Sequence, residues 1–169
     1  VAQWLFGEPD AVIERAAQLI DPWVWVEQLA PGAVLRVPKS KESTFYQASR
    51  ALTYLALSPS PAVKIGGTLV LDASLQEGFG SEEGFVAALT QYRPPWDRVL
   101  RGSPITGAGS QRILMLALAA QHYSIKIRGC FCPEPFVRLG IDASAEETVV
   151  PDGWLDVRNP FVQIPQWRA

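Results

Sequence analysis

The chain has 169 residues, of which 48% are hydrophobic and 19% are charged, a composition typical of a globular domain with a sizeable core. Its 15 basic and 17 acidic residues give a formal net charge of −2, so the charge balance gives no reason to expect binding to nucleic acid or to an acidic membrane. No apolar run approaches the roughly 18 residues of a transmembrane helix, and no signal peptide is visible at the start, so we expect a cytoplasmic protein.

The N-terminal quarter of the chain predicts one helix and two short strands. Proline and aspartate at positions 9 and 10 open the helix. Its apolar face is expected to comprise Val12, Ala16, Leu19 and Ile20, and Pro22 is expected to end it. Residues 23–26 and 33–38 then predict strands. The first residue is Val1 rather than methionine, so we expect the chain to be part of a longer protein.

A second helix is predicted to begin after Thr44, which stands three residues before Gln47 in the T-x-x-Q form of a capping box. Apolar residues at helical spacing would form its buried face: Phe45, Ala48, Leu52, Leu55 and Ala56. Tyr46, Gln47, Arg50 and Tyr54 lie on the other side, three or four residues apart. Side chains at this spacing are neighbours on a helix surface.

A strand, a glycine-rich turn and a third helix follow. Residues 68–73 are mostly apolar and rich in β-forming residues, which favours a strand covered on both faces of a parallel sheet. The turn at residues 77–81 leads into a helix beginning at Glu82, for which Ser81 is the expected N-cap. Open α/β sheets place ligands where a strand ends in such a turn. We interpret Gly78 and Gly80 as backbone devices for the turn, with the lining of a neighbouring cleft as the alternative.

The remaining elements complete an α/β pattern. One or two helical turns are predicted at 96–100, a long helix at 110–121 and a strand near a sheet edge at 124–128. The tail from Val150 is expected to be extended, because it is rich in proline, and to be pinned by aromatic residues. Strand–helix alternation predicts a single domain over 1–169, with a three-layer, mostly parallel, Rossmann-like sheet and helices on both faces.

The glycine-rich turn, the cysteines and the histidine give little support for a cofactor, metal or catalytic site. The turn reads G-x-G-x-x-x-G, one residue too long for a dinucleotide fingerprint, and Glu82 and Glu83 in the first helical turn would repel a phosphate. Cys130 and Cys132 provide only two soft donors, so we expect two unligated thiols and no metal site. The single histidine, His122, is expected to act as a helix C-cap. No nucleophile with a nearby base is evident, so no catalytic residue is predicted in this chain.

The segment TFYQASRA, followed by a G-G strand and EGFGSEEGF, resembles the C-terminal domain of the nickel-dependent lactate racemase family over roughly residues 39–129. In that family this helix presents a tyrosine, a glutamine and a lysine toward substrate and cofactor. The matching positions are Tyr46, Gln47 and Arg50, so an arginine replaces the lysine. Arginine is a fixed cation that clamps carboxylate or phosphate, which favours anion binding over proton transfer. A family tryptophan at the start of the long helix corresponds to Gln111.

The resemblance implies a two-domain parent, in which a nickel-pincer nucleotide is held by a lysine of the N-terminal domain and two histidines act as acid and base. This chain has one histidine, so we expect it to be inactive alone and to bind neither cofactor nor metal by itself. Its expected partners are its own N-terminal domain and a small anion such as a 2-hydroxy acid. The alternative is a non-catalytic ligand-binding or protein-interaction module, because fold alone does not decide function.

Overall fold

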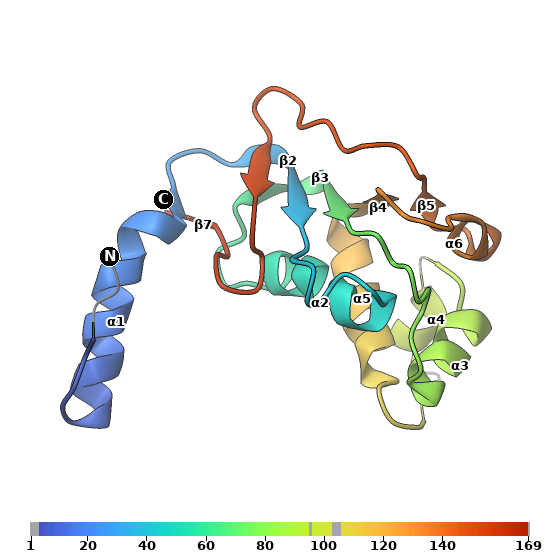
Figure 1. Cartoon of the computed structure of the whole chain (residues 1–169), viewed down its shortest axis with the longest axis horizontal. Coiled ribbons are helices and arrows are strands. Elements are labelled where there is room, and N and C mark those ends of the chain that lie inside the picture. Colours follow the sequence, from blue (N-terminus) through green and yellow to red (C-terminus); the bar gives the residue numbers. More distant parts are fainter. Residues whose placement is uncertain (1–3, 95, 103–105, 169) are drawn as a thin grey trace.

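The structure is a computed structural model that describes residues 4–94, 96–102 and 106–168, with Pro22 and Trp23 described in their backbone only (Figure 1). The helices are α1 (Pro9–Val24), α2 (Phe45–Ala56), α3 (Glu83–Gln91), α4 (Asp97–Leu100), α5 (Gln111–His122) and α6 (Glu134–Leu139). The strands are β1 (Trp25–Val26), β2 (Ala30–Arg36), β3 (Val63–Asp72), β4 (Ser124–Arg128), β5 (Asp142–Ala143), β6 (Leu155–Val157) and β7 (Gln166–Trp167). None of the described helices is both long and apolar enough to cross a membrane.

Five strands form one parallel sheet in the order β5-β4-β3-β2-β6, and β1 pairs with β7 in a second, two-stranded parallel sheet. The predicted α/β class with a mostly parallel, Rossmann-like sheet is therefore confirmed. Strand β4 lies next to the short edge strand β5, as its alternating pattern predicts. The C-terminal tail is more regular than expected, because β6 joins the main sheet and β7 returns to β1.

The strand order explains where the helices lie. Strands β2, β3, β4 and β5 stand side by side in chain order, and right-handed crossovers between them place their connecting helices on the same face. In Figure 1, α2 and α5 lie together below the strands. Strand β6 lies on the far side of β2, so the chain after β5 returns along the opposite face. No helix lies among the described residues between β5 and β6, so this extended segment forms the layer on that face, where the sequence predicts helices. On that face Val70 of β3 shares a cavity with Thr148 and Trp154 of the returning segment.

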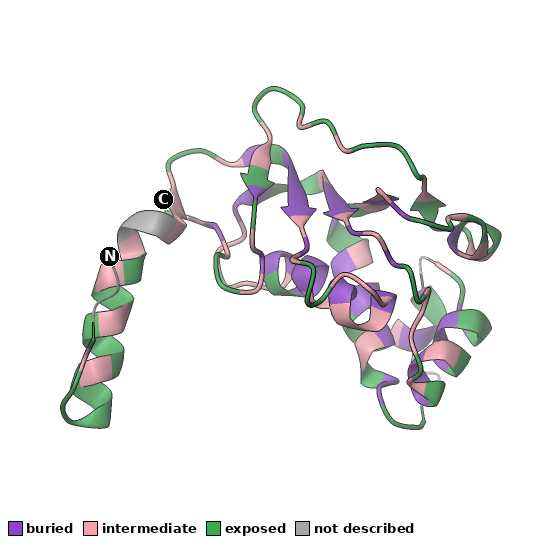
Figure 2. Ribbon diagram, in the orientation of Figure 1, coloured by how far each residue is buried: buried purple, intermediate pink, exposed green. Residues whose placement is uncertain are grey.

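The core lies between the sheet and the helices. Leu35, Leu71 and Ile127 of three adjacent strands have no exposed surface and belong to one apolar cluster with the buried faces of α2 and α5. Three aromatic rings pack together in this cluster. The ring centroid of Phe45 in α2 lies 6.0 Å from that of Phe85 in α3 and 5.5 Å from that of Phe136 in α6. Figure 2 shows that buried residues concentrate in the strands and in α2, whereas α1 is mostly exposed.

Three local predictions were wrong. Helix α1 continues through Pro22 to Val24; its last turn closes beyond the proline because Asp21 accepts hydrogen bonds from both the backbone and the ring nitrogen of Trp25. Its expected apolar face is not buried, since Ile20 is 51% exposed. Helix α3 begins at Glu83 with Glu82 as N-cap, and the expected N-cap Ser81 lies outside it.

Helix α6 was not predicted from the sequence. It has only six residues, too few for a periodic pattern, although signals typical of helix ends are present. Pro133 precedes it, and Gly140 ends it in the left-handed conformation at φ 89°.

Gly32 of β2 packs directly against the ring of Trp154, which belongs to the segment between β5 and β6. A Cβ atom at this position would lie 2.6 to 2.7 Å from three ring carbons of Trp154. Gly32→Ala is therefore expected to lower the free energy of unfolding by about 1–3 kcal/mol through overpacking, measured by urea denaturation. In a Trp154→Ala background the same substitution is expected to cost less than about 0.5 kcal/mol. Equal costs in the two backgrounds would show that the ring contact is not the cause.

Candidate anion-binding site

The start of α2 is held at the carboxyl edge of the sheet by the loop that follows β3. Residues 42–46 and 75–79 run side by side and exchange four backbone hydrogen bonds of 2.8 to 3.2 Å, namely Leu75 N to Glu42 O, Glu77 N to Ser43 O, Phe45 N to Gly78 O and Tyr46 N to Phe79 O. Because β2 and β3 are parallel, the loops after both strands meet at this edge, where open α/β sheets bind ligands.

These bonds leave little of the helix end available to a ligand. The first backbone N–H groups of α2 already have partners, because Phe45 and Tyr46 donate to the loop carbonyls and Gln47 donates to the Thr44 hydroxyl at 3.3 Å. The Thr44 half of the predicted capping box is therefore present. The reciprocal half is not, because Oε1 of Gln47 is buried without a partner among the described residues. Anion binding at this edge must come from side chains and not from the helix N-terminus.

Two arginines lie over the ring of Tyr46. The guanidinium carbon of Arg50, one turn along α2, is 5.7 Å from the ring centroid, and that of Arg112, from the first turn of α5, is 6.0 Å away. Both distances are in the range of cation–π contacts. Phe85 packs its edge against the same ring at 5.3 Å between centroids. The Tyr46 ring thus gathers two cations from helices that are far apart in the sequence. We call Tyr46, Gln47, Arg50 and Arg112 the α2–α5 cluster.

Polar atoms of this cluster are buried without hydrogen-bond partners. Oε1 of Gln47, Nε of Arg50 and Nε of Arg112 all lack a partner in the described part of the chain. Buried polar groups are normally paired, so each exception calls for an explanation. Among the described residues, three of the seven such atoms lie in this cluster, and the other four are scattered over Ser58, Trp96, Ser144 and Thr148. This concentration makes the cluster the candidate site.

Some arginines elsewhere in the described residues form ion pairs with aspartates. Arg36 bridges Asp72 at 2.8 Å and Asp156 at 2.6 Å, and Arg128 reaches Asp142 at 2.8 Å. Arg50 and Arg112 have no carboxylate partner among the described residues. Neither α2 nor α5 contains an aspartate or a glutamate, so neither arginine has an acidic neighbour one turn away on its own helix.

Burial and repulsion both act on Arg112. Partial burial lowers the pKa of Arg112, and the nearby charge of Arg50 lowers it further. The ordinary value is so high that the guanidinium stays protonated near neutral pH. The site is therefore a fixed pair of cations, suited to binding an anion and unable to move a proton through either arginine.

The other predicted site residues lie around this cluster in different ways. Gly80 is in the left-handed conformation at φ 101°, and a Cβ there would lie 3.4 Å from Cβ of Tyr46, so the turn passes directly beside the cluster. Gly78 accepts the first hydrogen bond of α2 but faces open space. Gln111 is exposed on the first turn of α5, and no ring contact or hydrogen bond joins it to the cluster within the described residues.

Sequence reasoning missed Arg112. A signal was present, because Arg112 follows Gln111 and its helix offers no acid to pair with it. What the sequence could not show is the packing of α5 against α2. That packing brings a nitrogen of the Arg112 guanidinium to within 3.5 Å of the Thr53 hydroxyl.

Titratable groups elsewhere do not assemble a metal site within the described ranges. No group of three or more histidine, cysteine, aspartate or glutamate side chains is arranged there to hold a metal ion. His122 is exposed in the last turn of α5. Cys130 and Cys132 are both free, the first buried and the second exposed.

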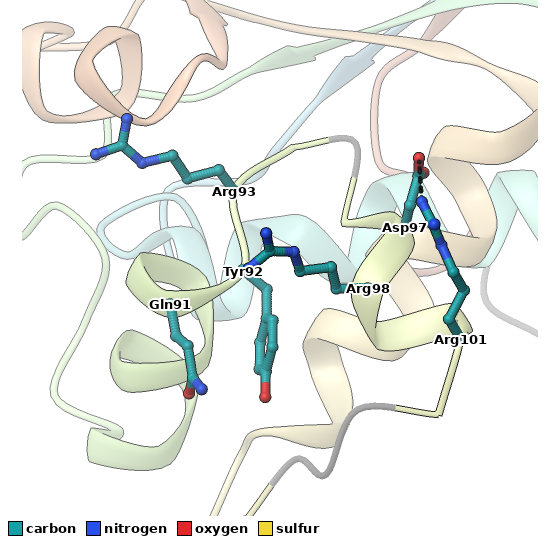
Figure 3. Close-up of a pocket in the computed structure, with 6 residues that line it drawn as sticks. All are labelled: Gln91, Tyr92, Arg93, Asp97, Arg98 and Arg101. Atoms are coloured by element: carbon teal, nitrogen blue, oxygen red, sulfur yellow. Dashed lines mark ion pairs between the residues drawn. The ribbon is translucent and has the colours of Figure 1, made fainter.

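A separate cavity of about 480 Å³ lies beside α3 and α4, lined by Gln91, Tyr92, Arg93, Asp97, Arg98 and Arg101 (Figure 3). Its arginines do not converge on one point. In Figure 3, Arg93 points away from the other side chains, and Arg101 is directed to Asp97 at 3.6 Å. None of the predicted site residues lines this cavity, so we place the candidate site at the α2–α5 cluster.

The two thiols are expected to be slow nucleophiles. The Glu134 carboxylate, which accepts the Cys132 thiol hydrogen at 3.3 Å, raises the pKa of Cys132, and burial raises the pKa of Cys130. A raised pKa reduces the thiolate fraction, and the thiolate is the reactive form. At pH 7.5 we expect iodoacetamide to modify Cys132 more slowly than a free cysteine and to leave Cys130 unmodified, as read by mass spectrometry. Glu134→Gln should accelerate modification of Cys132, and an unchanged rate would contradict this account.

A solved structure of a known protein has a similar fold. The structure is similar to the lactate racemase apoprotein from Thermoanaerobacterium thermosaccharolyticum, with a TM-score of 0.68 and 14% sequence identity. The match covers 94% of this chain and 40% of that one, so this chain spans less than half of the racemase. No protein-family model matches the sequence, and no curated protein sequence matches it. The chain thus has a lactate racemase-like fold.

Proposed function

We propose that this chain is the anion-binding C-terminal domain of a racemase-like isomerase, and that it is inactive alone. The α2–α5 cluster would face a cleft shared with an N-terminal domain of the parent protein and would bind a small 2-hydroxy acid or a similar anion. The observation that carries the proposal is the position of Arg50. It is stacked on Tyr46 at the carboxyl edge of the sheet, and its Nε and the neighbouring Gln47 Oε1 are buried with no partner in the part of the chain that the structure describes.

The residues of the cluster have distinct tasks in this proposal. Arg50 binds the carboxylate, because its planar guanidinium can donate two parallel hydrogen bonds to two oxygens. Stacking on Tyr46 restricts the arginine to one orientation before the anion arrives, which reduces the entropy lost on binding. The side-chain amide of Gln47 has an unused acceptor, suited to the hydroxyl hydrogen of a 2-hydroxy acid. These residues bind and orient, and the proton-transfer groups belong to the other domain.

A nickel-pincer nucleotide is the cofactor that the resemblance implies for the parent protein. The side chains described here fit only its anionic portion, because the cluster offers cations and amides and the described residues form no metal-ligand group. When bound in the parent, that group would accept and return hydride at the substrate carbon. Arg50 and Gln47 would contribute by holding the anion beside it. We place the parent protein in the cytoplasm, which the two free thiols support because cytosolic cysteines remain reduced.

A second function is favoured by α1. This helix extends from the rest of the domain in Figure 1 and exposes Ile13 to 65% and Ile20 to 51%, and the segment before it exposes Phe6 to 87%. Exposed apolar groups of this kind mark contact surfaces. A protein-interaction module with no ligand at the cluster would account for α1 but not for the unpaired arginines.

Replacing Arg50 in the full-length protein tests the proposed function. Arg50→Gln is expected to weaken L-lactate binding roughly 10- to 100-fold, as expected for loss of a charge-assisted, bidentate hydrogen bond, and to reduce 2-hydroxy-acid racemisation in parallel. Binding would be measured by calorimetry and racemisation by chiral chromatography. Arg50→Lys should retain part of both, because it restores the cation of the family pattern.

The matched control is Arg98→Gln, which removes an exposed arginine of α4 outside the cluster. It is expected to leave binding and turnover unchanged. If Arg50→Gln binds lactate as tightly as the parent protein does, Arg50 is not the anion ligand, and the interaction-module function becomes the better account.

A further inference from the structure

We propose that Arg112 is a second anion-binding residue of the same site, and that the ligand is a small dianion with two negatively charged groups. This inference rests on the proposed function and extends it to the substrate class. Two cations, Arg50 and Arg112, lie over the Tyr46 ring. A monoanion such as lactate would leave one of the two cations without a counter-charge.

The geometry brings both cations to the same aromatic ring. Both guanidinium carbons lie over the same Tyr46 ring, at 5.7 and 6.0 Å, and their separation cannot exceed the sum of these distances. Thr53 links the Arg112 side chain to α2, since its hydroxyl accepts from a guanidinium nitrogen of Arg112 at 3.5 Å and donates to the backbone carbonyl of Arg50 at 3.1 Å. The two arginines are therefore tied to the same stretch of α2.

The charges around the pair leave it without an internal counter-ion. The groups that act electrostatically on Arg112 are Arg50, Tyr46 and Tyr54, and none of them is a carboxylate. Glu82 comes close to the neighbouring glycines, since a Cβ at Gly80 would meet its carboxylate oxygen at 3.3 Å. No ion pair joins Glu82 to either arginine within the described residues. Two adjacent, partly buried cations repel each other and lose hydration, so the apo site is destabilising by itself.

A purely structural role for Arg112 predicts something different. If the arginine only packed on Tyr46, its removal would lower the melting temperature and leave anion selectivity unchanged. If it serves a dianion, its removal relieves repulsion in the apo protein and selectively weakens dianion binding. Stability and selectivity therefore separate the two roles.

The experiment uses the full-length protein and three probes at pH 8: L-lactate, L-malate and inorganic phosphate. The full-length protein without substitutions is expected to bind at least one of the two dianions about 10-fold more tightly than L-lactate, which corresponds to one additional charge-assisted contact. Calorimetry gives the affinities, and thermal shift gives the stabilisation that each anion produces. L-malate and phosphate distinguish the two sources of a dianion, a dicarboxylate substrate and the phosphate of a nucleotide.

The variants are Arg112→Gln, Arg112→Lys and the control Arg98→Gln. Arg112→Gln is expected to abolish the dianion preference, to leave L-lactate affinity within about threefold, and not to lower the melting temperature without ligand. Arg112→Lys should keep a reduced preference, because it retains the charge but not the planar fork. Arg98→Gln should behave like the parent protein.

The outcomes distinguish the role of Arg112 from the proposed function. Equal affinity for L-lactate and both dianions, or a dianion preference that survives in Arg112→Gln, overturns the assignment of Arg112 while leaving the proposed function in place. Failure of all three anions to bind, with Arg50→Gln also without effect, overturns the proposed function itself. Loss of the preference in Arg112→Gln, with L-lactate binding retained, supports the dianion.

Discussion

The short ladder of backbone hydrogen bonds between residues 42–46 and 75–79 is the constraint on which the candidate site depends. It joins the loop after β3 to the chain that enters α2. With these bonds made, Tyr46 is fixed against Phe85 and beside the turn at Gly80. The ring can then hold Arg50 from its own helix and Arg112 from α5 in fixed positions. The same bonds occupy the N–H groups of Phe45 and Tyr46 at the helix end. Polar groups available at this edge are therefore those of side chains.

The α2–α5 cluster is an arrangement that contributes little to stability. Three arginines elsewhere, Arg36, Arg101 and Arg128, pair with aspartates. In this cluster the chain holds two arginines together with no described acid and leaves three buried polar atoms without partners. Folding gains little from such an arrangement, because each unpaired buried group costs free energy. Residues that disfavour the apo domain yet remain ordered by packing are typical of sites that are completed by a ligand.

Part of this picture could be predicted from the sequence because its signals are local. Helical spacing identifies α2, and a β-rich run flanked by glycine identifies the main part of β3. The Thr44 cap is visible as a four-residue pattern. Strand β6 has only three residues and pairs with the distant strand β2. The sequence around it therefore contains no pattern that predicts a strand. Arg112 likewise enters the cluster only because α5 packs on α2, and a contact between helices has no counterpart in a periodic pattern.

The pairing of β6 with β2 also bears on how the domain is assembled. The Arg36–Asp156 hydrogen bond spans 120 positions of the chain, so this edge of the sheet can close only after β6, at Leu155–Val157, has been made. Contacts of such long range slow folding, because the intervening segment loses its freedom before the contact is gained. During synthesis on the ribosome, this edge of β2 would stay uncovered until β6 emerges. Strand β6 is therefore essential to the sheet, and a truncation that removed it would expose an unpaired edge of β2.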